Sequence, residues 1–445
     1  MVDINDIPTW VRKGLEATTY VDNYNVSEEE LAEIHAVWEM VSEFGDGDHL
    51  NLLGCSTSGA SVSLMGTSCE DEKYLIWDGF YFAITKACIY LTFADDDNDT
   101  ERLCKAFAYN LLKACSSRLL RNYPLQSFVL MQLPILFFSD KNDNDDDALK
   151  FKFSMSKWGQ RAGEVCSIIR KFVLYHEIGH YFYSSPGLNT AFRDSIDEKV
   201  GHAKKLIRMS EKRRNDAILE TPETSRRSSE FPNLQTYQNF GLFNDRSTLL
   251  QDVLRSNSSK EEIWCDLFAI ERLIVHQLAL KKGFSDIYLS LMLSYYIESI
   301  LHGVTLCYSR SPFYNLSRMG KETDGVDVDF RELRARMEMR TTLLQAIALQ
   351  FNPEWGVSEF KENVFYDARK FMDRFTKLEK YISLSRLVMR PMMKKWEKYF
   401  SQQTHEEKEA IYAWHRKRLG WHIEDDSNLL QNQNNQAKPP ATEEE

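Results

Sequence analysis

The sequence lacks the long apolar runs that membrane-spanning helices require. A helix that crosses a bilayer takes about 18–20 consecutive apolar residues. The longest candidate, residues 287–297 (IYLSLMLSYYI), is too short and predicts a buried helix instead. The N-terminus also lacks the basic segment followed by an apolar segment that marks a secretory signal. We therefore expect a cytoplasmic protein with no membrane partner.

The sequence also lacks an excess of positive charge and closely spaced cysteine pairs. The chain has 55 Lys and Arg against 66 Asp and Glu, a net charge of −11. Nucleic-acid binding requires a dominant positive field, so nucleic acid is not an expected partner. The eight cysteines contain no C-x-x-C pair, which predicts free buried thiols in a reducing compartment.

The 445 residues, 43% of them hydrophobic, predict two or three cores in an α+β, mainly helical fold. Residues 1–150 are expected to be mixed α/β, and residues 151–310 to form a helical core interrupted by a polar insertion at about 203–257. Residues 311–420 predict a helical C-terminal region. Residues 421–445 lack apolar periodicity and predict a disordered tail.

The first region contains signals of both helix and strand. Ser27 begins a capping box ahead of an amphipathic helix, and a second helix is expected to start at Thr100. Residues 74–77 and 128–138 are the best strand candidates, and the Gly/Ser-rich residues 54–68 are expected to form a loop.

Two acidic runs, residues 95–99 and 140–147, suggest calcium ligands by composition. The second run fails the EF-hand pattern, because Asp145 stands where the loop needs glycine and Phe151 where it needs glutamate. Both runs are therefore expected to be solvated loops.

The segment 171–183 (KFVLYHEIGHYFY) places His176 and His180 on the buried face of a helix. They continue a helical stripe of apolar side chains formed by Val165, Ile168, Ile169 and Phe172. Residues four apart stand about 5–6 Å apart at Cβ, from where two imidazoles can reach one metal ion at about 2.0–2.1 Å. This is the H-E-x-x-H zinc signature. Glu177 is positioned as the general base toward a metal-activated water, and Gly179 keeps the helix narrow.

A catalytic zinc site needs a third protein ligand. The longer pattern H-E-x-x-H-x-x-G-x-x-H is absent, because Tyr183 and Pro186 occupy its last two positions. The other common solution is a glutamate on a second helix with an aspartate four residues later. After His180 the chain contains one such pair, Glu262 and Asp266.

The local sequence around this pair fits a ligand helix. Ser258 and Glu261 predict a capping box that starts the helix and leaves Glu262 free. Asp266 is expected to hydrogen-bond a ligand histidine, and the small Ala269 to allow the two helices to approach closely. These features predict one Zn²⁺ held by His176, His180 and Glu262.

HEIGH followed by E-x-x-x-D-x-x-A resembles the gluzincin zinc metallopeptidases. Among them the segment EIWCDLFAIERL is most similar to the cytoplasmic bacterial Lit-like phage-exclusion proteins and the ImmA/IrrE-like peptidases. The resemblance covers the two helices. It implies a zincin-like core, with His176, His180 and Glu262 as ligands and Glu177 as general base. Asp266 would hydrogen-bond one of the ligand histidines. The 81 residues between His180 and Glu262 depart from the compact pattern.

Several candidates stay open. His202 is a competing third ligand, and His276 is expected to be a satisfied core residue. No spacing singles out a donor for the oxyanion among Tyr295, Tyr296, His302, Arg331, Arg334 and Arg336. A basic cluster at 204–227 predicts either a solvated helix or a lid or docking patch for an acidic partner.

The sequence therefore predicts a zinc metallopeptidase that acts on a protein or peptide substrate. The alternative is a zinc-stabilised regulatory or binding protein without turnover. A non-proteolytic hydrolase that uses the same zinc chemistry is a third hypothesis. The oligomeric state is not predicted.

Overall fold

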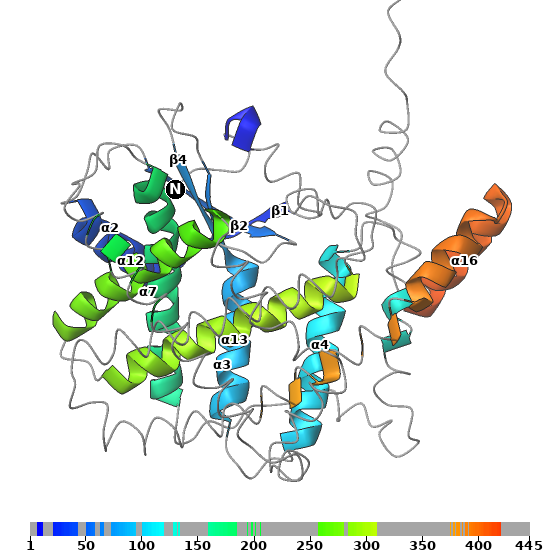
Figure 1. Ribbon diagram of the computed structural model, residues 1–445. Helices are drawn as coiled ribbons and strands as arrows, with labels where there is room; N and C mark the ends of the chain where they lie inside the picture. Colours follow the sequence, from blue (N-terminus) through cyan, green and yellow to red (C-terminus); the bar gives the residue numbers. More distant parts are fainter. Residues whose placement is uncertain are drawn as a thin grey trace, which may run out of the picture.

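The computed structural model describes the parts of the chain that build one helical body and its sheet (Figure 1). The described residues are 7–11, 21–42, 50–57, 63–65, 73–94, 100–119, 128–130, 132–133, 159–184, 257–279, 284–308 and 391–419, with single positions between 194 and 205 and between 374 and 389. Helices dominate these residues and one small sheet accompanies them, so the predicted α+β, mainly helical class is confirmed.

The sheet is mixed and has four strands in the order β1-β2-β4-β3. They are β1 (Val21–Asn23), β2 (Leu50–Thr57), β3 (Ser63–Met65) and β4 (Lys73–Asp78). β2 and β4 run parallel, with Leu53 opposite Ile76, and the two outer pairs are antiparallel. Strand β4 confirms the strand predicted at 74–77.

Side chains of β4 enter two cores from its two faces, as the period of two in a strand dictates. Leu75 and Trp77 belong to the main core. Tyr74 and Ile76 pack instead in a smaller cluster with Leu53, and neither side of this strand faces solvent.

Two predictions in this region are wrong. Residues 54–68 were expected to form a loop, but Gly54–Thr57 lies in β2 and Ser63–Met65 forms β3. Pairing with β4, and with β1 at Ser56 and Thr57, supplies their backbone partners. Residues 128–138 were expected to form a strand, but the described positions 128–130 and 132–133 are helical. There Phe128 stacks on Trp396 with ring centroids 4.7 Å apart.

Three helices follow the capping and periodicity of the sequence: α2 (Glu28–Ser42), α3 (Gly79–Phe93) and α4 (Thr100–Leu119). The predicted capping box is confirmed at α2, where the Glu30 carboxylate accepts from the Ser27 backbone N–H at 2.9 Å. Asp78 caps α3 by accepting from the N–H groups of Phe80 and Tyr81 at 2.8 and 3.2 Å. The helix predicted from Thr100 is α4.

The long helix α7 (Gly159–Ser184) connects several of the other helices. It packs against α12 (Asn257–Ala279), α13 (Phe284–Tyr308), α3 and α2 (Figure 1). Residues 287–297 lie in α13 and are largely buried, as predicted. None of the helices in the described ranges is long and apolar enough to cross a bilayer.

An ion-pair network fixes α7 against α2. The Arg170 guanidinium donates to Glu33 at 2.6 Å and to Glu29 at 2.9 Å, and the Ser167 hydroxyl also donates to Glu33. This fixes the rotation of α7 about its axis, and therefore the direction of the side chains further along the helix.

The thiols are free, as predicted. The seven described cysteines are buried and form no disulfide: Cys55, Cys88, Cys104, Cys115, Cys166, Cys265 and Cys307.

The last described helix is α16 (His405–Leu419). Both acidic runs, the tail predicted at 421–445 and, apart from Lys205 and Asn257, the insertion predicted at 203–257 lie outside the described residues.

Candidate metal centre

The two histidines project from one face of α7. The side chains that lead up to them in the same helix are buried: Val165, Ile168, Ile169 and Phe172. His176 is 9% exposed and packs near the Phe172 ring, with centroids 6.3 Å apart. The His176 and His180 rings lie edge to face at 5.0 Å. The apolar stripe thus ends in two adjacent imidazoles.

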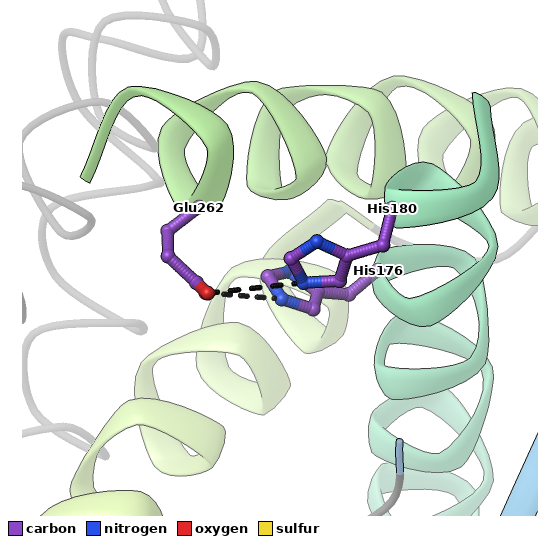
Figure 2. A group of neighbouring side chains, drawn as sticks. All are labelled: His176, His180 and Glu262. Carbon is purple, nitrogen blue, oxygen red and sulfur yellow. Dashed lines mark ion pairs between the residues drawn. The ribbon is translucent and has the colours of Figure 1, made fainter. Parts of the chain in front are cut away.

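Helix α12 crosses α7 and brings Glu262 to these imidazoles (Figure 2). One carboxylate oxygen of Glu262 lies 3.3 Å from Nε2 of His176, and the other lies 3.8 Å from Nε2 of His180. One ligand atom from each of the three residues lies within 4.8 Å of the other two. The structure therefore brings together the three residues that the sequence predicted as ligands.

The contacts of Glu262 can be compared with the spacing of ligand atoms around a tetrahedral zinc ion. Ligand bonds of 2.0–2.1 Å at tetrahedral angles place two ligand atoms about 3.3–3.4 Å apart. The contact between His176 Nε2 and Glu262 already has this length, at 3.3 Å, and the contact with His180 is 0.5 Å longer. Two imidazole nitrogens and one carboxylate are also a donor set that zinc accepts.

The other ring nitrogen of each histidine meets a carboxylate of α12. Nδ1 of His176 lies 2.9 Å from Asp266, which is 1% exposed. Nδ1 of His180 lies 2.9 Å from Glu261. Asp266 thus occupies the place that the sequence predicted for it. Glu261 does not, since its carboxylate was expected at the helix cap and instead contacts a ring on the neighbouring helix.

Electrostatics favour positive charge at this position. Burial lowers the pKa of His176, but contacts with Asp266 and Glu262 outweigh burial and raise that pKa to about 10. Burial, together with Glu262, Asp266 and other carboxylates, also raises the pKa of the Cys265 thiol. Acidic side chains therefore dominate the potential around the two rings.

Glu177 is half-buried and lies one residue from His176 on α7. Tyr81 of α3 lies within reach of its charge: burial, Glu298 of α13 and then Glu177 raise the pKa of the Tyr81 hydroxyl. Sequence analysis did not connect Tyr81 with this site. No signal in its local sequence could have done so, because Tyr81 and Glu177 are separated by almost a hundred residues.

Close helix packing brings the donors together. A Cβ atom on Gly179 would lie only 3.1 Å from Cα of Cys265 and 3.2 Å from its Cβ. Ala269, one turn further along α12 from Cys265, is fully buried. The absence of a side chain at 179 therefore sets the distance between the helix with the histidines and the helix with the carboxylates.

Among the described residues, the remaining sequence candidates do not belong to the group of His176, His180 and Glu262. Tyr295 is buried and meets the Phe172 ring edge-on at 5.9 Å, and Tyr296 is half-buried. His276 is buried and shares a 2.9 Å hydrogen bond with the Tyr175 hydroxyl, which is the satisfied core position predicted for it. The remaining candidates lie outside the described side chains: His202, His302, Arg331, Arg334 and Arg336.

No family model, curated protein or solved structure matches the chain.

Proposed function

We propose that this protein is a zinc-dependent metallopeptidase with a zincin-like core, in which His176, His180 and Glu262 bind one Zn²⁺. The observation that carries the proposal is the convergence of both Nε2 atoms and the Glu262 carboxylate at ligand-like distances. The H-E-x-x-H pattern supports the assignment, because it places a carboxylate of the right type beside the first ligand.

The charge balance supports a cation at this position. The carboxylates of Glu261, Glu262 and Asp266 contact two imidazoles. Even with both rings protonated, these five side chains carry an excess of one negative charge. With both rings neutral the excess is three negative charges, and a divalent cation between the Nε2 atoms would offset two of them while leaving both rings neutral.

The proposed chemistry divides between the ion and Glu177. When bound, zinc polarises a carbonyl oxygen and lowers the pKa of a water molecule to about 7. Glu177 accepts the proton during attack on the peptide carbonyl and passes it to the leaving amine. Asp266 contacts Nδ1 of His176, the ring nitrogen that does not face the proposed ion, and so orients the ring. The substrate class is a protein or peptide, and the absence of disulfides among the seven described cysteines supports a reducing, cytoplasmic environment.

Substitution of Glu177 tests the enzymatic part of the proposal. Glu177→Gln should retain one equivalent of zinc and lose at least 100-fold in turnover, because the amide cannot take the proton. Zinc content is measured by elemental analysis. Turnover is measured by mapping new protein N-termini in cells that express either form, since this readout needs no known substrate.

Glu262→Ala provides the complementary result, namely loss of zinc from a folded protein. Equal N-terminal profiles for wild type and Glu177→Gln, with zinc bound to both, would favour the zinc-stabilised binding protein instead. A wild-type protein that purifies and refolds without any affinity for zinc would refute the metal centre itself.

A further inference from the structure

His180 lies between two consecutive carboxylates of α12. Its Nδ1 is 2.9 Å from Oε1 of Glu261, and its Nε2 is 3.8 Å from Oε1 of Glu262. Consecutive residues of an α-helix project about 100° apart, so the two side chains reach the ring from different directions. Only the contact with Glu261 has hydrogen-bond length.

This difference in length selects one tautomer of His180. A neutral imidazole carries a proton on one nitrogen and a lone pair on the other, and an ionised carboxylate only accepts hydrogen bonds. The contact with Glu261 therefore holds the proton on Nδ1. The lone pair is left on Nε2, the atom that faces Glu262 and His176 (Figure 2).

We propose that Glu261 is a positioning residue that keeps His180 in the tautomer and ring orientation required for metal binding. The inference rests on the proposed zinc site and concerns how tightly that site holds its metal. Asp266 makes the corresponding contact to His176, so each ligand ring has a carboxylate of its own at Nδ1. A carboxylate at this position also makes the imidazole a stronger ligand.

The two positioning carboxylates differ in their exposure to water. The Asp266 side chain is 1% exposed and that of Glu261 is 35% exposed. Water competes for an exposed carboxylate and screens its charge. Glu261 is therefore expected to act more weakly than Asp266. His180 should then be the less firmly oriented of the two histidine ligands.

The test compares Glu261→Ala and Glu261→Gln in the full-length protein. Zinc affinity is measured by competition with a chromophoric chelator of known affinity. Glu261→Ala should raise the dissociation constant about 10-fold, the lower end of the range for such outer partners. Glu261→Gln should stay within about threefold of wild type, because its amide oxygen accepts the same hydrogen bond.

A second measurement reports on the ring itself. All three proteins are compared without metal. Nitrogen-15 correlation spectra of His180 should show a protonated Nδ1 in wild type and in Glu261→Gln, and a mixture of tautomers in Glu261→Ala. Glu164→Ala is the matched control. It removes a carboxylate from α7 that contacts Gln160 at 3.4 Å, twelve residues before His176, and it should change neither affinity nor the spectrum.

The outcomes separate the two proposals. Failure of the wild-type protein to bind zinc would overturn the metal centre. Tight zinc binding by wild type, with equal affinity and an unchanged His180 spectrum in Glu261→Ala, would overturn only the role of Glu261. A Gln variant as weak as the Ala variant would also overturn it. If the Ala variant does not fold, persistence of the Nδ1 proton in Glu261→Gln decides the question.

Discussion

Gly179 is the residue that allows the two ligand helices to approach each other. A methyl group at this position would meet the backbone of α12 at Cys265, at 3.1 Å. A helix backbone cannot move away as cheaply as a flexible side chain, so the whole contact has to open by a few tenths of an ångström. Because Glu262 lies one turn from Cys265 on α12, the same shift would alter its distances to the imidazoles.

Gly179→Ala should therefore lower both stability and zinc affinity. Overpacking costs about 1–3 kcal/mol, while replacing a glycine in a helix gains about 1 kcal/mol. We expect a net loss of about 1 kcal/mol, measured by chemical denaturation, and weaker zinc binding in chelator competition.

Gly163→Ala is the matched control in the same helix. Its added Cβ meets nothing within 4 Å, so the variant should gain the full helix propensity, about 0.5–1 kcal/mol. If both variants were stabilised equally, the close approach at Gly179 would not constrain the helix pair.

Arg374 closes the C-terminal end of helix α3 from inside the protein. Its side chain is 3% exposed, and Nη1 donates to the carbonyl oxygens of Leu91, Thr92 and Ala94 at 2.7–2.8 Å. The last carbonyls of a helix have no partner within the helix, and here they are buried. The two N–H groups of Nη1 are therefore shared among three acceptors.

Arg374→Met should lower the free energy of unfolding by roughly 2–4 kcal/mol, because buried acceptors lose a charged donor. The measurement is the denaturation midpoint. Arg374→Lys should lose less, since an ammonium group can still donate to some of these oxygens. Lys380→Met removes an exposed cation six residues later and should have almost no effect. A similar small effect at Arg374 would show that water replaces the guanidinium.

The helices illustrate which features the sequence can predict. The ligand face of α7 and the pair Glu262 and Asp266 follow from periodicity within one segment, and such patterns are local. The partner of Glu261 is not local. Whether its carboxylate caps α12 or reaches His180 depends on how two helices cross, and His180 and Glu261 lie 81 positions apart in the sequence.

The two wrong predictions, a loop at 54–68 and a strand at 128–138, failed for the same reason, because strand pairing depends on residues outside the local segment. Gly54 looks like a loop residue until it pairs with Trp77 of β4, which supplies the backbone partners. The largely apolar run 128–138, which predicted a strand, cannot be told from a buried helix by periodicity alone. The helical form of its described positions is accompanied by the stack of Phe128 on Trp396, which is far away in sequence.

In the molecule as a whole, the proposed metal would join two helices that pack against each other. Helix α7 contacts α2, α3, α12 and α13, and α12 carries Glu262, the proposed third ligand. A metal that binds only the folded chain stabilises it in proportion to the logarithm of its concentration. Zinc at a thousand times its dissociation constant should therefore add about 4 kcal/mol to the free energy of unfolding.

His180→Ala is the variant suited to testing this linkage. It removes one ligand but leaves the buried Asp266 paired with His176, so the metal-free fold should suffer little. The readout is the increase in unfolding free energy on adding zinc, not the stability itself. That increase should nearly vanish in His180→Ala and persist in His405→Ala, which removes an exposed histidine from α16. An equal increase in all three proteins would place the stabilising zinc elsewhere, because removing a ligand of the bound ion has to weaken its binding and so reduce the linkage.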